Sequence, residues 1–362
     1  MPRFVKGLKL SALYYERVVK PIIESNFPEL EYSAGLIGSG SEVLGYDTRQ
    51  SSDHNWGPRL FIFLSENDFE DSKDKVDLSL REKLPYTFLG YSTSFGKPDQ
   101  IGVRLQEQRT TGNIEHYIEV HTIRSYFKGY LNIDPYNQLS FPTWLTISEQ
   151  KLLSIVKGRI FHDDLGLRGV IKRFQYFPKD VWLYLLASQW SRISQIEAFV
   201  GRTADVGDEL GSKLMAAKII RELMRLSFLM ERKYAPYEKW FGTAFSELRI
   251  AKRLMGVFNQ ILAANSPKER EILLSNAYEI VAIEHNSLNI TKPLPTEVSK
   301  FHNRPYLVIH GEIFSAEIRK KIKSRAVRDA PLLGSVNQFL DSTEAMENTD
   351  FLEKMRNFFL VS

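Results

Sequence analysis

The chain has 362 residues, and its 48 basic and 44 acidic side chains leave a net charge of only +4. This balance excludes a polybasic tail protein and an acidic disordered one, while 43% hydrophobic residues suffice for a large core in two domains. The chain contains no cysteine, which excludes disulfide scaffolds, thiolate zinc sites and cysteine nucleophiles. No signal-peptide pattern and no apolar stretch of roughly 20 residues is present, so we expect a cytoplasmic protein without a membrane partner.

The first elements of the chain are a helix and two strands. Apolar residues at mostly helical spacing predict an amphipathic helix over residues 8–24. A short strand is expected over residues 32–38, directly before the glycine- and serine-rich turn at 38–41. After a polar loop, the apolar run 60–64 is typical of a buried strand. The order is therefore strand, glycine turn, connector, strand.

The next segments alternate between surface and sheet character. Charges dominate residues 68–83, which suits a surface helix or loop. Residues 114–123 alternate in polarity and predict a half-buried strand that carries Glu119 and His121 on one face.

Beyond residue 145, the sequence changes from strand-like patterns to long helical patterns. Helices are expected from Pro178 to about Gly201 and over residues 208–232, 237–264 and 267–285. Residues 304–310 predict a strand and 313–328 a basic helix. We therefore predict an α/β (α+β) fold in which a mixed sheet is followed by an α-helical bundle domain. The predicted domains are residues 1–145, residues 146–300 and a strand-helix extension, residues 301–362, packed on the helical domain.

One motif in the first predicted domain indicates a chemical function. The segment Gly35-Leu-Ile-Gly-Ser39, then Gly45, then Ser52-Asp-His-Asn55 and the strand at 60–64 resembles the signature of the nucleotidyltransferase superfamily. Over nearly its whole length, the chain also resembles an uncharacterised bacterial group that is classed as nucleotidyltransferase-like and carries a domain of unknown function. The residues that carry this longer resemblance are 38–45, 53–59, 197–202, 206–212 and 234–240.

The resemblance implies a nucleotidyltransferase-like sheet and transfer of a nucleoside monophosphate from a nucleoside triphosphate to an unknown acceptor hydroxyl. Such transfer needs the triphosphate charge neutralised and the attacking oxygen aligned, a task suited to two Mg²⁺ ions. In an extended segment, residues i and i+2 face the same way, so Asp53 and Asn55 project together, and Glu119 is the candidate third ligand. The predicted catalytic and metal-binding residues are therefore Asp53, Asn55 and Glu119.

The glycine- and serine-rich turn is the predicted phosphate site. Gly38, Ser39, Gly40 and Ser41 would let backbone N–H groups and hydroxyls approach phosphate oxygens without interference from bulky side chains. Arg59 would add a cation nearby. Each of these features also has an interpretation without a function. The glycine- and serine-rich segment could be an ordinary turn, Asp53 could cap the next element, and Glu119 could be a solvated residue on a strand face.

The motif departs from the superfamily pattern at one position. Asn55 stands where a second metal-binding aspartate is expected, so the site has one negative charge fewer with which to bind Mg²⁺. Two functions follow: a nucleotidyltransferase that uses Mg²⁺ and a nucleoside triphosphate with a small-molecule or macromolecular acceptor, or a catalytically impaired nucleotide-binding sensor or scaffold. Nucleic acid is not required as a partner, given the net charge of +4.

The helical half contributes further candidates. Gln189 and Arg192 are three residues apart and could line a groove for the nucleotide. By analogy with small-molecule nucleotidyltransferases, Glu197 or Asp208 would be the general base for the acceptor hydroxyl, although Asp208 equally suits a helix cap and Glu197 a salt bridge. Four cations on one helix face could be solvated or could bind phosphate or an acidic partner: Lys218, Arg221, Arg225 and Arg232.

Overall fold

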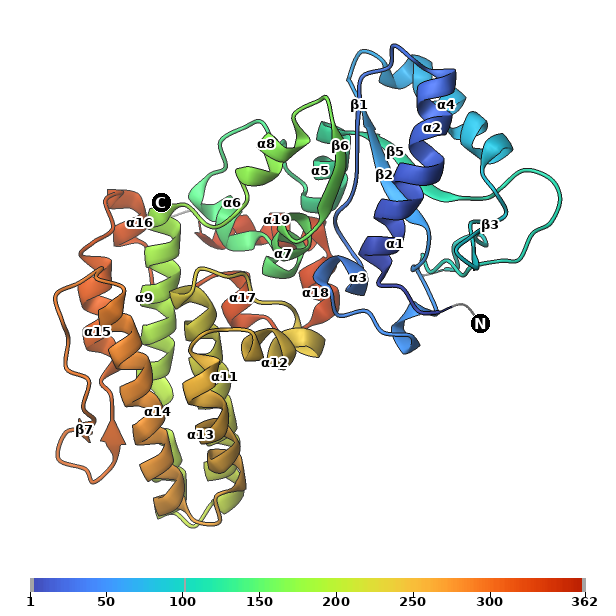
Figure 1. Cartoon of the computed structure of the whole chain (residues 1–362). Coiled ribbons are helices and arrows are strands. Elements are labelled where there is room, and N and C mark those ends of the chain that lie inside the picture. Colours follow the sequence, from blue (N-terminus) through green and yellow to red (C-terminus); the bar gives the residue numbers. More distant parts are fainter. Residues whose placement is uncertain (1–2, 101, 360–362) are drawn as a thin grey trace. The chain divides into compact units, whose positions relative to one another are not determined.

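The computed structural model describes residues 3–100 and 102–359. The chain forms two compact units, each built from two stretches of sequence (Figure 1). One unit contains the residues up to 138 together with 151–175, and the other contains residues 139–150 together with those from 176 onward. The predicted domain limits at residues 145 and 300 stay predictions; the units differ from them because residues 151–175 return to the first unit.

The first unit is built on a mixed four-stranded sheet with the strand order β5-β2-β1-β6. Strand β1 pairs antiparallel with β2 and β6, whereas β2 pairs parallel with β5, so a crossover connection joins β2 to β5. The elements of this unit are α1 (Gly7–Tyr14), η1 (Tyr15–Val19), α2 (Lys20–Asn26), β1 (Tyr32–Leu36), α3 (Ser41–Leu44), η2 (Gln50–Ser52), β2 (Arg59–Leu64), α4 (Phe69–Lys83), β3 (Thr87–Phe88), β4 (Tyr91–Ser92), β5 (Tyr117–Thr122), α5 (Ile123–Leu131), β6 (Arg159–Asp163) and α8 (Leu167–Lys172).

The predicted N-terminal helix is confirmed, with one irregularity. Residues 7–26 are helical throughout, but η1 is a π-helical turn between α1 and α2. The turn comes just before Pro21, which has no N–H group for a regular helical hydrogen bond.

The two faces of the sheet differ in polarity. Alternate residues of β2 and β5, together with α1, α2 and α4, form one hydrophobic core, which includes Leu60, Ile62, Leu64, Ile118 and Val120. The intervening positions pair Arg59 with Tyr117, Phe61 with Glu119, and Phe63 with His121 across the two strands. The predicted placement of Glu119 and His121 on one face is thereby confirmed.

The second unit is mostly helical. Its long helices pack pairwise, α15 on α9, α9 on α11, α11 on α14 and α13 on α14. The elements are α6 (Phe141–Thr146), α9 (Lys179–Ile196), α10 (Phe199–Asp205), α11 (Glu209–Met230), α12 (Glu238–Ser246), α13 (Ala251–Ala263), α14 (Pro267–Ser287), β7 (Ser299–Lys300), β8 (Leu307–Val308), α15 (Gly311–Arg319), α16 (Arg325–Asp329), α17 (Val336–Phe339), α18 (Thr343–Glu347), α19 (Thr349–Met355) and η3 (Arg356–Phe359). Helix α7 (Glu149–Val156) begins in this unit and continues in the first.

A mixed α/β fold is therefore present, whereas the classification of the second unit as a helical bundle stays a prediction. The single helix expected over residues 237–264 is wrong, because α12 and α13 are separate. The carboxylate of Glu231 accepts the N–H of Ile250 at 2.9 Å and stabilises the break between them. Within the described residues, every helix is too short or too polar to cross a membrane.

Candidate functional site

The turn at Gly38–Ser41 connects β1 to the short helix α3. Gly38 and Gly40 have φ angles of 83° and 146°, a region that non-glycine residues rarely occupy. A Cβ atom at Gly40 would overlap the Arg59 guanidinium and the Glu42 carboxylate, and one at Gly38 would overlap the Tyr126 hydroxyl. Both the backbone conformation and the close approach of neighbouring side chains therefore require glycine here.

Arg59 supports this turn from the beginning of β2. Its Nε donates to Glu42 Oε1 at 2.7 Å, and its Nη2 lies 2.6 Å from the same oxygen. The Nη2 group also donates to the carbonyl oxygen of Ser39 at 2.6 Å. Both charged side chains are buried, with 5% and 2% of their surface exposed. Arg59, predicted to bind phosphate, thus has a structural role in holding the turn, and its phosphate-binding role stays a prediction.

Three polar side chains that sequence reasoning missed lie beside the turn. The Tyr130 hydroxyl is 3.3 Å from Ser39 Oγ and 2.8 Å from Ser154 Oγ. The carbonyl oxygen of Ser154 accepts the N–H of Gly38 at 3.1 Å. Lys151 is only 6% exposed, and its Nζ lies 5.4 Å from the centre of the Tyr130 ring. We call Ser39, Tyr130, Lys151 and Ser154 the turn cluster; no local pattern predicted it, because Ser39 is far in sequence from the other three residues.

Glu119 lies on the same face of the sheet as Arg59. Its Oε2 atom is 3.2 Å from the Nε2 atom of His121, two residues along β5. The hydrogen bond from His121 lowers the pKa of Glu119, burial opposes this shift, and the charges of His121, Arg59 and Arg104 add to the lowering. Glu119 is therefore an ionised carboxylate that is partly open to solvent.

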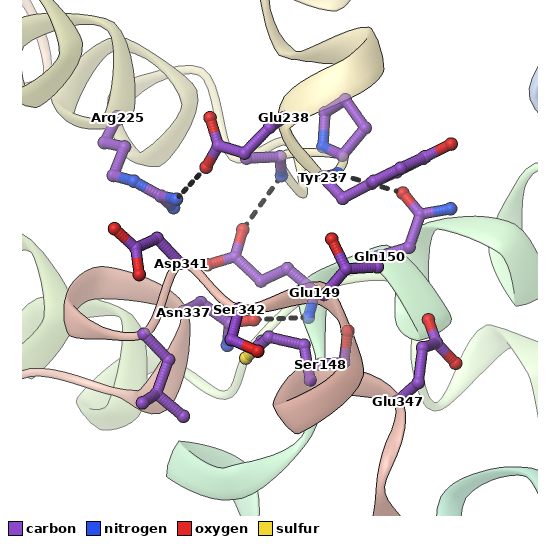
Figure 2. Close-up of a pocket in the computed structure, with 15 residues that line it drawn as sticks. Ser148, Glu149, Gln150, Arg225, Tyr237, Glu238, Asn337, Asp341, Ser342 and Glu347 are labelled. Carbon is purple, nitrogen blue, oxygen red and sulfur yellow. Dashed lines mark hydrogen bonds and ion pairs between the residues drawn. The ribbon is translucent and has the colours of Figure 1, made fainter.

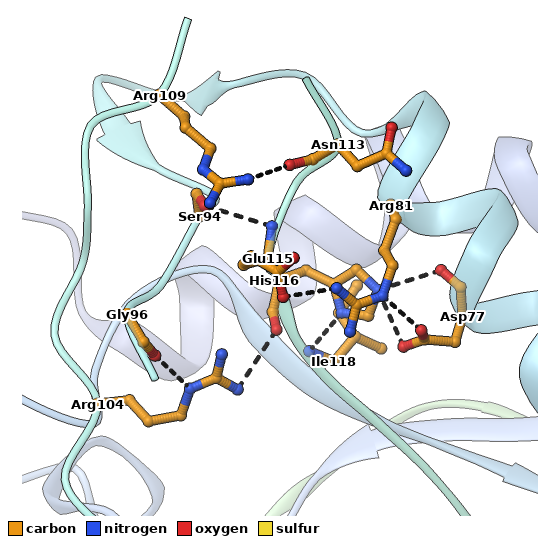
Figure 3. A network of polar contacts seen from close by, with 10 residues as sticks. All are labelled: Asp77, Arg81, Ser94, Gly96, Arg104, Arg109, Asn113, Glu115, His116 and Ile118. Atoms are coloured by element: carbon orange, nitrogen blue, oxygen red, sulfur yellow. Dashed lines mark hydrogen bonds and ion pairs between the residues drawn. The ribbon is translucent and has the colours of Figure 1, made fainter. Parts of the chain in front are cut away.

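A polar network fixes the beginning of β5 and hence the position of Glu119 (Figure 3). Arg81 donates from Nε to Asp77 Oδ2 at 2.5 Å and from Nη1 to Glu115 Oε2 at 2.6 Å. The Nδ1 atom of His116 accepts the N–H of Ile118 at 3.2 Å. Burial lowers the pKa of His116, and its ring is held by the backbone of Ile118 as part of this network. Arg104 donates to the carbonyl oxygens of Gly96 and His116 and links the preceding loop to the strand.

Asn55 closes the loop before β2. Its φ angle is 47°, its N–H donates to the carbonyl oxygen of Arg104 at 2.9 Å, and its Oδ1 accepts the N–H of Arg104 at 2.8 Å. Asparagine tolerates this left-handed conformation better than most residues do. The amide oxygen that was predicted to bind a metal is therefore already engaged with the backbone.

Asp53 is separate from this clamp. Its side chain is 69% exposed, and Oδ1 is 2.7 Å from Nδ1 of His54. The hydrogen bond with His54 lowers the pKa of Asp53. Asp53 also lines a surface pocket that includes Trp56, Tyr91 and Gln106.

These residues do not fit a two-magnesium site as they are arranged. Asp53 and Glu119 are each bound to a different histidine, and the Asn55 oxygen is bound to Arg104. Among residues 3–100 and 102–359, no group of three or more histidine, aspartate or glutamate side chains could hold a metal ion. The assignment of Asp53, Asn55 and Glu119 as metal ligands stays a prediction, and we derive no reaction step from it.

The candidates in the second unit have partners within that unit. Gln189 is fully buried; its amide donates to Glu222 Oε2 at 2.6 Å and accepts from Gln338 at 2.8 Å. Arg192 donates to both carboxylate oxygens of Glu222, at 3.2 and 3.0 Å. These contacts tie α9 to α11, and a nucleotide-binding role for Gln189 and Arg192 stays a prediction.

Glu197 and Asp208, the predicted general bases, lie at helix ends. The Glu197 carboxylate accepts the N–H of Ile309 at 3.2 Å and also interacts with the N–H groups of His310 and Gly311 at the start of α15. Burial, assisted by Glu312, raises the pKa of Glu197 to about 8. Asp208 accepts the N–H of Gly211 at 2.7 Å, so the expected helix cap is confirmed.

Comparisons with known proteins give one family model that matches part of the chain and one similar structure. Residues 144–241 match the model of a domain of unknown function, DUF4037, which supports the resemblance to an uncharacterised family. A crystal structure of a nucleotidyltransferase-like protein from Exiguobacterium sibiricum is 11% identical, with a TM-score of 0.33 over 76% of this chain and 78% of that chain. No curated protein matches the sequence. A TM-score this low does not establish a common fold.

Proposed function

We propose that the first unit binds the triphosphate group of a nucleotide at the Gly38–Ser41 turn. The observation that supports this proposal is the turn cluster, in which a buried lysine and three hydroxyl groups lie beside a backbone that only glycine permits. Lysine is the cation of many phosphate sites, and hydroxyl groups donate hydrogen bonds to phosphate oxygens. The side chain of Arg59 supports the turn and keeps its backbone in the binding conformation.

Nucleotidyl transfer to an acceptor hydroxyl is the second candidate function. Glu119 favours it, because an ionised carboxylate lies on the sheet face that also carries Arg59, the support of the turn. In this proposal the carboxylates of Asp53 and Glu119 supply the negative charge in the first unit, and their role as Mg²⁺ ligands stays a prediction. Asn55 favours binding without transfer, because it supplies no charge and its oxygen is held by Arg104.

Calorimetric titration of the full chain with ATP, GTP, CTP and UTP tests the first proposal, with Mg²⁺ and with EDTA. We expect binding under both conditions and a loss of about fivefold in affinity for Tyr130→Phe, the value of one hydrogen bond. Tyr136→Phe is the matched control, because Tyr136 is an exposed tyrosine of the same unit. The proposal is wrong if no triphosphate binds or if both tyrosine variants behave alike.

Pyrophosphate release tests the second candidate. If the missing carboxylate limits a transferase, Asn55→Asp will increase the release of pyrophosphate from a bound triphosphate, because an aspartate adds the missing negative charge. Absence of release from the natural chain and from Asn55→Asp, under conditions where both bind triphosphate, rejects transfer and leaves the binding proposal intact.

A further inference from the structure

A groove in the second unit has no role in the proposed function. Its volume is about 530 Å³, which is in the range of small-molecule sites. It is lined by residues of α9, α15 and α16, and α9 and α15 lie side by side (Figure 1). By comparison, the pocket beside Glu149 and Arg225 has a volume of about 40 Å³, which has room for water molecules but not for a metabolite (Figure 2). The groove is therefore the stronger candidate for a ligand site.

Helix α15 places three polar side chains along the groove. Glu312, Ser315 and Arg319 follow one another at intervals of three and four residues, so they lie on one face of the helix. Glu312 and Arg319 are separated by two turns, which is about 10 Å along a helix axis. The groove therefore has an acid near one end and a cation near the other, with a hydroxyl group between them.

Arg319 joins the basic end of the groove to α16. Its Nε donates to the carbonyl oxygen of Arg328 at 2.6 Å, and its Nη2 donates to that of Ala330 at 3.2 Å. Its Nη1 donates no hydrogen bond to another described residue. Arg328 is held more loosely, because its Nη1 is 3.4 Å from the carbonyl oxygen of Ile322 and its Nε is 3.7 Å from Asp329 Oδ1, too far for a hydrogen bond. Both guanidinium groups therefore keep N–H donors for an acceptor from a ligand.

Positive charge exceeds negative charge at this end. From the start of α15 to the end of α16, the chain contains six lysines and arginines but only three acids. Lys320, which lines the groove, pairs with Glu317, and Arg325 pairs with Asp329 at 3.3 Å. One acid of α9, Asp180, also faces this segment, where it accepts two backbone N–H groups. The charges of the two arginines in the groove are in excess of these pairs, so the basic end suits an anion.

Two hydroxyl groups of the groove have no hydrogen-bond partner among the described residues. Ser315 is only 3% exposed, yet its hydroxyl bonds to no other side chain or backbone group that the structure describes. The hydroxyl of the half-buried Ser191, on α9, is likewise unbonded within the described chain. Buried polar groups are nearly always hydrogen-bonded, so an oxygen atom of a ligand would satisfy Ser315.

The two ends of the groove select different groups of a ligand. A phosphate offers several oxygen atoms and up to two negative charges, and arginine binds it through paired hydrogen bonds. The Glu312 side chain at the other end is 60% exposed; its carboxylate accepts hydrogen bonds from hydroxyl groups and repels a second anion. A nucleic acid would use the exposed Lys321 and Lys323 outside the groove rather than the buried hydroxyl of Ser315.

We propose that this groove binds a small phosphomonoester that carries hydroxyl groups, the chemical class of the sugar phosphates. Its phosphate oxygens accept hydrogen bonds from Arg319 Nη1, Arg328 and the Ser315 hydroxyl. Its hydroxyl groups bond to Ser191 and donate to Glu312. All of these residues belong to the second unit, so the proposal does not depend on triphosphate binding at the Gly38–Ser41 turn.

Calorimetric titration of the full chain tests the proposal with four kinds of compound. These are glycerol 3-phosphate, ribose 5-phosphate and glucose 6-phosphate; the same three compounds without phosphate; inorganic phosphate; and a single-stranded RNA. We expect at least one phosphomonoester to bind with a dissociation constant below about 1 mM, and inorganic phosphate and the unphosphorylated compounds to bind at least about tenfold more weakly. Absence of phosphomonoester binding, whether or not the RNA binds, overturns the proposal, and so does equal binding of inorganic phosphate.

Variants connect binding to the groove. Arg328→Met is expected to weaken phosphomonoester binding by about tenfold, the value of a lost charged hydrogen bond, and Ser315→Ala by about fivefold, the value of a neutral one. Arg253→Met and Ser275→Ala are matched controls outside the groove, because Arg253 is exposed on α13 and Ser275 is a buried serine that bonds within α14. Ser315→Ala changes no charge and keeps the test valid if Arg328→Met does not fold. Unchanged affinity in the groove variants that fold overturns the proposal.

Tyr130→Phe separates the groove from the triphosphate site. Tyr130 belongs to the turn cluster of the first unit, so we expect its substitution to leave phosphomonoester affinity unchanged. Equal weakening by Tyr130→Phe and Arg328→Met would show that the compound does not bind in the groove alone, and would overturn the proposal. Failure of phosphomonoester binding leaves the triphosphate proposal in place, because that proposal is tested with other ligands.

Discussion

Two arginines of this protein whose side chains are largely shielded from solvent, Arg59 and Arg225, differ in what surrounds them. Arg59 donates to the Glu42 carboxylate and the Ser39 carbonyl and so fixes the turn at the end of β1. Arg225 has an ion pair at 3.6 Å and a small pocket in front of it. A buried charge with complete hydrogen bonding stabilises the fold, whereas one with incomplete bonding is available to a ligand. The first unit therefore has a turn that is held by complete hydrogen bonding of Arg59, whereas Arg225 in the second unit is incompletely bonded.

Removal of each arginine is the strongest test of this difference. Arg59→Met leaves the buried Glu42 charge without a partner, so we expect a loss of about 3–5 kcal/mol in the free energy of unfolding. Arg225→Met removes an ion pair at 3.6 Å from the half-exposed Glu238, which keeps Arg221 as a partner, and a charge that favours ionised Glu149; about 1 kcal/mol is expected. Chemical denaturation followed by circular dichroism measures both. Equal losses for the two variants would contradict the comparison.

The pH dependence of stability extends the comparison to a buried acid. Because burial raises the pKa of folded Glu197 to about 8, the folded state holds this proton between the unfolded pKa of about 4.3 and pH 8. Its contribution to stability is complete below pH 4 and is lost as the pH rises to about 8, with a slope of up to about 1.4 kcal/mol per pH unit. Denaturation of the natural chain and Glu197→Gln at several pH values measures the difference, and parallel curves would refute it.

Substitution of glycine tests the rigidity of the turn. Gly40→Ala places a Cβ against Arg59 and Glu42 at a φ angle of 146°, and we expect it to cost about 2–3 kcal/mol and to abolish triphosphate binding. Gly112→Ala is the matched control, because Gly112 also has a positive φ angle but no atom within 4 Å of the added Cβ. We expect the control to cost about 1 kcal/mol. Unfolding curves that coincide for the two variants would show that the turn tolerates a side chain.

The smallest expected effect concerns the clamp at Asn55. Asn55→Asp keeps an oxygen acceptor for the Arg104 N–H and tolerates the same backbone, so the change in stability should be below about 0.5 kcal/mol. Asn55→Ala removes that acceptor and should cost about 1–2 kcal/mol. Thermal unfolding distinguishes the two, and a large loss for Asn55→Asp would assign Asn55 a further contact.

Local patterns predicted elements well where a single face decides burial. The alternation in residues 114–123 placed Glu119 and His121 correctly, and Asp208 was recognised as a helix cap. Strand β6 was not predicted, because its residues are only half-buried and its place beside β1 depends on a return of the chain. The break between α12 and α13 was missed, since it depends on a contact from Glu231.

The candidate site residues also fall into two groups, those that local sequence identifies and those that only the structure brings together. The glycine-rich turn was recognisable from sequence, because glycine at such positions reflects a local conformational need. The partners of that turn were not recognisable, because Tyr130, Lys151 and Ser154 are about ninety or more residues away along the chain. Arg225 belonged to a row of four cations that could be solvated; only the structure shows that its side chain is buried beside Phe241.

The sequence alone determined the mixed α/β composition, the polarity of individual strands and helices, and the positions where only glycine suits the backbone, because these depend on residues close together in the chain. The tertiary structure decided which polar groups are satisfied: the Glu42 carboxylate by Arg59, the Asn55 amide by the backbone of Arg104, and the Glu222 carboxylate by Gln189 and Arg192. Burial and hydrogen bonding depend on neighbours brought together by folding, and they distinguish a structural charge from one that is open to a ligand.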